Sequence, residues 1–138
     1  MPSVKIDIDI KAAAEDVFDL ITKVEEFGRY SGLIREVRKL SPGVYRWEVE
    51  FLGVAARWEA EVSASERPRY FAWRSVSGLY NTGSYTLETG DGETHVTFEM
   101  EYRLSGTLME LLTAPVLSHV ITRVHKEVLG NVKKELEK

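Results

Sequence analysis

The sequence predicts an α+β fold in which a curved antiparallel sheet of seven strands surrounds one long C-terminal helix. Three patterns predict it: an alternating segment followed by two short helices, six further strand candidates in succession, and a helical apolar stripe near the C-terminus. The 138 residues show no internal repeat, low-complexity tract or linker, which predicts a single domain over residues 1–138.

The first segment is predicted to form a strand and then a helix. Apolar residues occupy alternate positions of the strand, at Val4, Ile6, Ile8 and Ile10. In the helix they recur at intervals of three and four, at Ala14, Val17, Phe18, Ile21 and Val24. A second short helix is expected over residues 25–30.

Six strands are expected next, over residues 35–40, 45–51, 56–62, 71–77, 84–88 and 96–104. The runs Ser41-Pro42-Gly43 and Asp91-Gly92 are turn signals between strands. Residues 78–83 are bounded by two glycines and are expected to form a loop.

The last segment is predicted to be a helix over residues 107–137. Its apolar stripe consists of Leu117, Val120, Ile121, Val124, Val128 and Val132. Pro115 is expected to start or kink the main part of this helix, because proline lacks the backbone donor.

One face of the predicted sheet is apolar and aromatic, and it should face the stripe of the last helix. We expect a ligand cavity between them; alternatively, the rings fill this space as an ordinary core. Hydroxyl groups in the same phase favour a small-molecule site, although each can instead bond to nearby backbone. The candidate ligand-binding residues are Tyr45, Trp47, Val49, Phe51, Trp58, Phe71, Trp73, Ser75, Ser77, Tyr85, Phe98, Met100, Tyr102, Leu117, Ile121 and Val124.

Composition and charge exclude several classes of protein. The chain has no cysteine, which excludes disulfides and zinc–thiolate sites and fits a reducing cytoplasm. A net charge of −4 argues against a general nucleic-acid binder. No signal-peptide core and no integral membrane segment are expected. The interspersed outer charges predict a monomer or weak homodimer, and a cytoplasmic location is expected.

No metal site, cofactor or catalytic residue is assigned. The glutamates in the opposite strand phase are expected on the solvated face rather than at a metal site, and they are Glu48, Glu50, Glu59, Glu61, Glu99 and Glu101. His119 and His125 lie on different faces of the predicted helix, which argues against a shared metal. His125 is interpreted either as a helix-flank residue or as a proton donor into the cavity.

Two places at the predicted cavity rim carry further hypotheses. Leu79 and Tyr80 are expected to gate the mouth, unless residues 78–83 are an ordinary hairpin loop. Residues 51–54 are a candidate second edge of that gate. Arg35 and Arg69 either hold a polar oxygen of a ligand at the inward rim or are surface cations at strand ends.

Local runs of the chain resemble a known superfamily. Residues 13–20 resemble the first-helix run of the START-like (SRPBCC) superfamily. Residues 45–62, 71–78 and 81–83 are similar to its polyketide cyclase/dehydrase branch, which is grouped with coenzyme Q-binding START-domain proteins. The resemblance covers nearly the whole chain and implies a helix-grip fold with a hydrophobic tunnel.

Three functions follow from these patterns and the resemblance. The favoured one is binding or transport of a hydrophobic small molecule, such as a lipid, quinone or polyketide-like compound. The second is a polyketide cyclase, aromatase or dehydratase; the resemblance implies an inward arginine for such an enzyme, and the chain offers no unambiguous one. The third is a ligand-free protein-interaction module, which requires a filled core and an apolar surface patch.

Overall fold

A computed structural model describes residues 3–51, 53–103 and 114–138 of the chain, without the side chains of residues 51, 54 and 114–116. Its elements are β1 (Ser3–Ile10), α1 (Ala14–Ile21), the 3₁₀ helix η1 (Val24–Arg29), β2 (Ile34–Ser41), β3 (Val44–Phe51), β4 (Val54–Glu66), β5 (Tyr70–Gly78), β6 (Tyr80–Gly90), β7 (Glu93–Arg103) and α3 (Ala114–Leu136). The predicted order of elements is confirmed.

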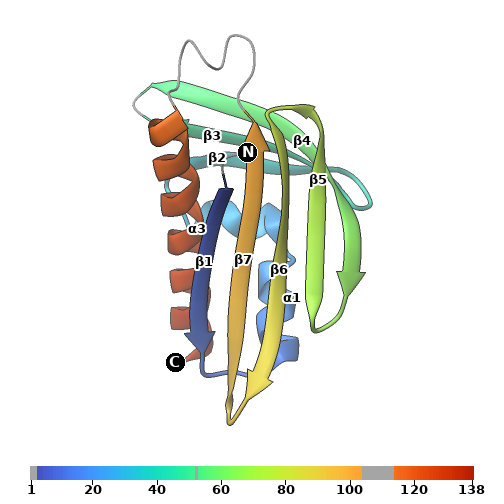
Figure 1. Cartoon of the computed structure of the whole chain (residues 1–138), viewed down its shortest axis with the longest axis vertical. Helices are drawn as coiled ribbons and strands as arrows, with labels where there is room; N and C mark the ends of the chain where they lie inside the picture. Colours follow the sequence, from blue (N-terminus) through green and yellow to red (C-terminus); the bar gives the residue numbers. More distant parts are fainter. Residues whose placement is uncertain (1–2, 52, 104–113) are drawn as a thin grey trace.

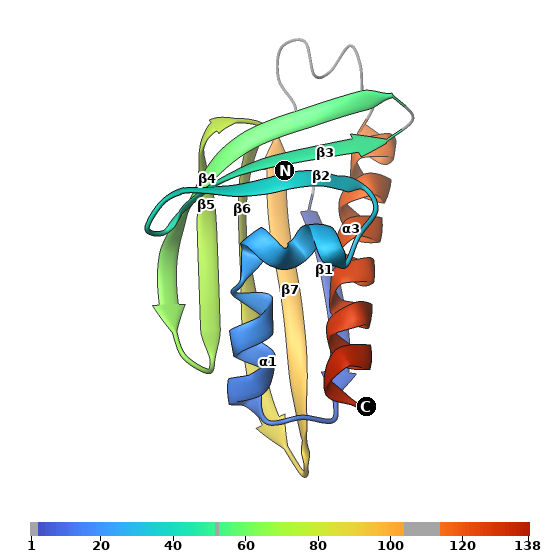
Figure 2. The same ribbon diagram turned by 180° about the vertical axis from the view of Figure 1, so that it is seen from behind.

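The strands form one antiparallel sheet in the order β1-β7-β6-β5-β4-β3-β2. Strands β2, β3 and β4 cross the direction of β1, β7 and β6, so the sheet is strongly bent around its inner face (Figure 1). Seen from behind, α1, η1 and α3 lie on that inner side (Figure 2). The expected seven-stranded curved sheet with a C-terminal helix is therefore confirmed.

The bend coincides with two breaks in the pairing of β4 with β5. Glu59 pairs with Ser77 while Ala60 pairs with Ser75, which leaves Val76 as an extra residue in β5. An extra residue bends a strand and reverses the side to which the following side chains point. Ser77 is accordingly exposed beside the charged outer face, and its prediction as an inward residue is wrong.

Residues 78–83 do not form the expected loop. Only Leu79 separates β5 from β6, and residues 80–83 pair with β7. Leu79 is buried, whereas Tyr80 is exposed and lies beneath the Arg103 guanidinium, whose central carbon is 4.5 Å from the ring centroid. Buried Asn81 stabilises this tight turn, because its Nδ2 donates to the Leu79 carbonyl at 3.0 Å. The predictions that residues 78–83 form a loop and that Leu79 gates a cavity mouth are therefore wrong.

Helix α3 lies against the edge strand β1 and against α1. It begins at Ala114, so Pro115 occupies its first turn as predicted, while residues 107–113 of the expected helix lie outside the described residues. Two side-chain bonds fix η1 and its following turn to α3. Asn131 Nδ2 donates to the Tyr30 carbonyl at 2.7 Å, and Ser31 Oγ donates to Glu127 Oε1 at 2.6 Å.

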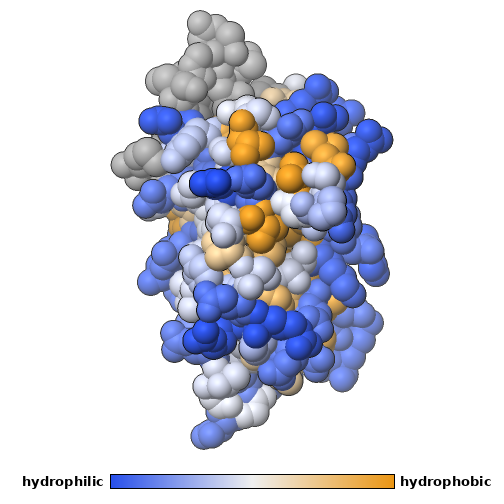
Figure 3. Space-filling model, turned by 90° about the vertical axis from the view of Figure 1, so that its right-hand side faces the viewer, coloured by the Kyte–Doolittle hydropathy of each residue, from blue (hydrophilic) through white to orange (hydrophobic). Residues whose placement is uncertain are grey.

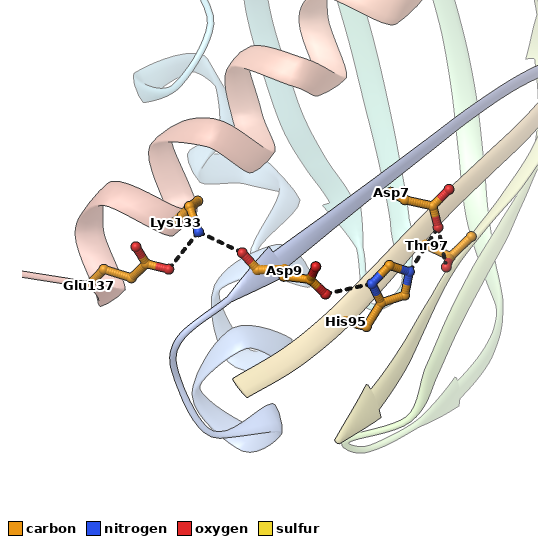
Figure 4. A network of polar contacts seen from close by, with 6 residues as sticks. All are labelled: Asp7, Asp9, His95, Thr97, Lys133 and Glu137. Carbon is orange, nitrogen blue, oxygen red and sulfur yellow. Dashed lines mark hydrogen bonds and ion pairs between the residues drawn. The ribbon is translucent and has the colours of Figure 1, made fainter. Parts of the chain in front are cut away.

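A polar network on the surface connects the C-terminal part of α3 to the sheet edge (Figure 4). Lys133 Nζ donates to the Asp9 carbonyl at 2.6 Å and pairs with Glu137 at 2.7 Å. On the outer face of the sheet, His95 lies between the carboxylates of Asp7 and Asp9, at 3.0 and 2.6 Å. The network therefore ties β1 both to β7 and to α3.

Candidate functional site

Two small apolar hollows lie between the inner face of the sheet and the helices. The first hollow has a volume of about 30 Å³ and is lined by Val24, Phe27, Tyr45, Trp47, Ala60, Glu61, Val62, Phe71, Trp73, Tyr85 and His125. The second has a volume of about 20 Å³ and is lined by Trp47, Val49, Trp58, Leu79, Met100, Leu117, Val120, Ile121, Val124 and His125. These volumes suit roughly one or two water molecules. Between the sheet and the helices, the described residues therefore line these two hollows in place of the single tunnel that was expected.

Trp47 and His125 are the two residues shared by these described linings, so their side chains form a partition between the hollows. The Trp47 indole stacks on Trp58, with centroids 5.6 Å apart and planes 9° apart. The His125 imidazole stacks on Phe98 at 4.0 Å and lies 6.5 Å from Trp47.

Trp73 closes the inner face between β5 and β6. Its ring lies over Gly83 of β6, where a Cβ atom would overlap the indole. The indole Nε1 donates to Asn81 Oδ1 at 3.1 Å, and the backbone N–H of Asn81 donates to Ser75 Oγ at 2.9 Å. The hydroxyl of Ser75 is therefore used by the backbone, which is the alternative that the sequence left open for each hydroxyl.

Tyr85 and His125, which both line the first hollow, each carry an unpartnered buried polar atom. Among the described residues, neither Tyr85 Oη nor His125 Nδ1 has a hydrogen-bond partner. Burial lowers the pKa of His125 to about 3, so the imidazole is neutral at pH 7. Burial raises the pKa of Tyr85 above its ordinary value, so the hydroxyl keeps its proton. The hollow thus presents two neutral hydrogen-bonding groups.

Tyr45 is half-buried in the lining of the same hollow. Burial foremost, and then the nearby charge of Glu25 and a hydrogen bond to it, raise the pKa of the Tyr45 hydroxyl. The hydroxyl of Tyr45 therefore lies near a carboxylate, unlike that of Tyr85.

The predicted site residues divide into several groups in the structure. Those in the first lining are Tyr45, Trp47, Phe71, Trp73 and Tyr85. Those in the second are Trp47, Val49, Trp58, Met100, Leu117, Ile121 and Val124. Phe98 and Tyr102 are buried but line neither hollow, and the side chain of Phe51 lies outside the described residues. Leu79, expected as a gate, instead lines the second hollow.

His125 is the lining residue that the sequence pattern left undecided. It lies four residues after Ile121 and eight after Leu117, which places all three on one ridge of the helix. That spacing was a signal for its inward position. Val24 already belonged to the apolar stripe of the predicted first helix, whereas Phe27 had no comparable signal, because its contribution depends on how η1 packs across the sheet.

Arg35 and Arg69 are surface cations, so the alternative in which they hold a ligand is wrong. Arg35 pairs with Glu50 at 2.6 Å and Glu48 at 3.3 Å, and Arg69 pairs with Glu66 at 2.9 Å. Cross-strand pairs also hold Glu59 and Glu61 on the charged outer face.

Two further findings concern the described part of the chain. No helix there has the length and apolar character needed to cross a membrane. Within the same ranges, no three side chains of the metal-binding types are grouped as a metal site requires.

Comparison with known proteins gives one family match and many structural neighbours. The model of a family described as polyketide cyclase/dehydrase and lipid transport matches residues 1–137. No curated protein matches the sequence.

Three solved structures illustrate the likeness in fold. A protein from Thermus thermophilus has a TM-score of 0.79 at 19% identity, over 95% of this chain and 97% of that one. A START superfamily protein from Mycobacterium smegmatis has a TM-score of 0.75 at 14% identity, over 98% and 97%. The Zhui aromatase/cyclase from Streptomyces sp. R1128 has a TM-score of 0.74 at 19% identity, over 99% and 93%.

Proposed function

The chain belongs to the polyketide cyclase/dehydrase and lipid-transport family of the START-like superfamily, and we propose that it binds and carries a hydrophobic small molecule between its sheet and α3. One observation supports this function above the others. The apolar inner face does not pack fully against the helices, and the two hollows that remain are separated by the side chains of Trp47 and His125.

A guest must enlarge this space in order to bind. Pockets for drug-sized ligands measure roughly 300–1,000 Å³, far more than either hollow. Displacement of Trp47 joins the hollows, and burial of roughly 300 Å² of apolar guest surface contributes roughly 7 kcal/mol before the costs of association. Rearrangement of the partition lowers this figure further, so we expect affinities no tighter than micromolar.

The test is to look for a guest in the purified protein and then to add one. Native mass spectrometry followed by denaturing extraction identifies what co-purifies. Thermal unfolding with a panel of lipids, quinones and polyphenols then measures stabilisation. A guest at about one hundred times its Kd should raise the Tm by roughly 5–10 °C.

A matched pair of variants ties the stabilisation to the first hollow. Ala60→Leu places a larger side chain in its lining and should abolish the effect of the guest. Ala14→Leu overpacks a buried site in α1 that lines neither hollow, so this variant should still be stabilised by the guest. If no compound co-purifies and none of the panel shifts the Tm, ligand binding is ruled out in favour of a ligand-free interaction module.

A second candidate function is catalysis of the cyclase, aromatase or dehydratase type. The observation that favours it is the presence of a buried hydroxyl and a buried neutral imidazole in one hollow. Such groups can donate and accept protons in a site that excludes water. With a poly-β-ketone as substrate, Tyr85→Phe should reduce turnover by roughly a hundredfold or more, and Tyr45→Phe should also reduce it. Tyr102 is buried outside both linings, so Tyr102→Phe should not reduce turnover. Guest binding without any turnover would exclude the enzyme.

The ligand-free interaction module has less support from the described surface. Large exposed apolar side chains there are Leu40, Val76 and Tyr80. Figure 3 shows that the apolar residues of one face form small separate clusters among hydrophilic residues rather than one broad patch. A dedicated protein-binding surface usually presents a larger continuous apolar area.

A further inference from the structure

The inner face carries one local exception to the rule that buried polar groups are hydrogen-bonded. Tyr85 and His125 are 1% and 7% exposed, and both line the first hollow. Among the described residues, Tyr85 Oη and His125 Nδ1 have no partner. A guest that supplied those partners would remove an unfavourable feature of the unliganded core.

Other polar groups nearby are satisfied, so the exception does not reflect a loosely organised core. Trp73 Nε1 donates to Asn81 Oδ1 at 3.1 Å, and Asn81 Nδ2 donates to the Leu79 carbonyl at 3.0 Å. Asn81 is itself fully buried. Among the described residues, the buried side-chain atoms that lack partners therefore belong to two residues of the first lining.

Phe98 holds both rings in place. The His125 imidazole stacks on Phe98 at 4.0 Å, and the Tyr85 ring lies 5.4 Å from Phe98 and 5.5 Å from Trp73. These contacts fix the rings, so the cost of orienting them for a guest is already met in the folded chain.

The first hollow offers no positive charge to a guest. No arginine or lysine is among its described lining residues, and the carboxylate of Glu61 is held by Arg74 at 2.7 Å. Burial keeps His125 neutral and Tyr85 protonated. An anionic group brought into this space would lose its hydration and find no opposite charge.

We propose that Tyr85 Oη and His125 Nδ1 are the polar anchors of the guest, and that the site selects an uncharged, hydroxyl-bearing aromatic molecule over both a hydrocarbon and a carboxylate. A hydroxyl group matches the pair because it donates and accepts, and so satisfies His125 Nδ1 in either tautomer. Aromatic rings in the lining favour a planar guest. This assignment rests on the proposed ligand-binding function.

Three single-ring probes of similar shape test the assignment: p-cresol, p-xylene and p-toluate, which differ in one substituent. Isothermal calorimetry with the full chain near pH 7 gives the three Kd values. We expect p-cresol to bind roughly tenfold more tightly than p-xylene, and p-toluate to bind most weakly.

Two variants remove the anchors one at a time. Tyr85→Phe and His125→Phe should each reduce the preference for p-cresol over p-xylene by roughly fivefold or more. Tyr102→Phe removes the hydroxyl of a tyrosine that is equally buried but lines neither hollow, and it should keep the wild-type preference. The Tm of unliganded Tyr85→Phe should equal or exceed that of the wild type, because the hydroxyl has no partner to lose.

The possible outcomes distinguish a failure of the anchor assignment from a failure of the proposed ligand-binding function. Equal binding of p-cresol and p-xylene, or a preference unchanged by both anchor variants, overturns the anchors and leaves apolar binding intact. Tighter binding of p-toluate overturns the charge selection, and a Tm of Tyr85→Phe several degrees below wild type shows that the hydroxyl is already bonded. Failure of all three probes to bind, with no guest found by extraction, overturns both the anchors and the function.

Discussion

Among single residues, Trp73 and Gly83 illustrate how one side chain depends on the absence of another. The indole of Trp73 lies flat over Gly83 on the neighbouring strand, and it fills the inner face there while bonding to Asn81. Any Cβ at position 83 would overlap the six-membered ring of the indole. Glycine is therefore required at this position because the Trp73 indole lies so close to its Cα, and not because the backbone adopts an unusual conformation.

We predict that Gly83→Ala destabilises the protein by roughly 1–3 kcal/mol, because Trp73 must move from its packed position. Urea unfolding measures the change. The control is Gly130→Ala in α3, where an added Cβ meets open space and helix propensity should stabilise by up to roughly 1 kcal/mol. An unchanged midpoint for Gly83→Ala would mean that Trp73 does not lie over this glycine.

The buried imidazole of His125 makes stability depend on pH in a defined direction. Its folded pKa is lowered to about 3 by burial, whereas the ordinary value is 6.5. Between these values the unfolded chain binds the additional proton, so stability rises with pH across this interval and is constant above it.

From this difference we predict that lowering the pH from about 6.5 to about 5 costs the wild type about 2 kcal/mol more than it costs His125→Phe. Chemical denaturation of both proteins at several pH values gives the two slopes. Parallel pH profiles would show that His125 is protonated in the folded state and hence hydrated.

At the scale of elements, the edge strand β1 is held by polar contacts on one side and by α3 on the other. Hydrogen bonds to Asp9 and Asp7 raise the pKa of His95, and bonds from Thr97 and His95 lower that of Asp7. The contribution of His95 is therefore complete below its ordinary pKa of 6.5 and is lost as pH rises through the higher folded value.

A His95→Gln variant tests this connection between β1 and β7. The variant should be less stable than the wild type near pH 6, and the difference should shrink as the pH rises to about 9. The His95 side chain is 41% exposed, so added salt should also shrink the difference. Unfolding curves at two pH values and two salt concentrations measure this difference in stability. An NMR titration of the wild type measures the pKa of His95. A difference that grows with pH would reverse the assigned sign.

For the whole molecule, the decisive feature is how nearly the sheet closes on α3. The sheet bends where β4 and β5 lose register, and this bend places Trp47, Trp58 and Trp73 around a common interior. The space left in that interior is small and is divided by the partition of Trp47 and His125. The capacity of the molecule for a guest therefore depends on side chains rather than on the backbone.

We predict that Trp47→Leu joins the two hollows into one cavity. The substitution should cost less than the roughly 3–5 kcal/mol of a full truncation to alanine, and added benzene should recover part of that cost. Val96→Ala enlarges the core at a fully buried site outside both linings and should gain nothing from benzene. Thermal unfolding with and without benzene makes the comparison. Equal benzene effects in the two variants would show that Trp47 does not separate the hollows.

Local pattern determined much of this protein. The period of two in the strands and the stripe of the last helix were sufficient to predict the seven-stranded sheet, the helix against it and the apolar phase of Trp47, Trp58 and Phe98. These features follow from the sequence because alternation and helical spacing decide which side chains share a face. The turn at residues 78–83 and the inward position of Ser77 were mispredicted, because an extra residue at Val76 and the bonds of Asn81 have no periodic signature.

Only the tertiary structure decided which inward residues border empty space. Ser75, Phe98 and Tyr102 share the phase of the lining but border no hollow, whereas Val24 and His125 reach the first hollow from separate helices. The physical reason is that a void is a property of many side chains packed from distant parts of the chain. Its volume and its unpaired polar atoms depend on rotamers and on the bend of the sheet, which no local pattern specifies.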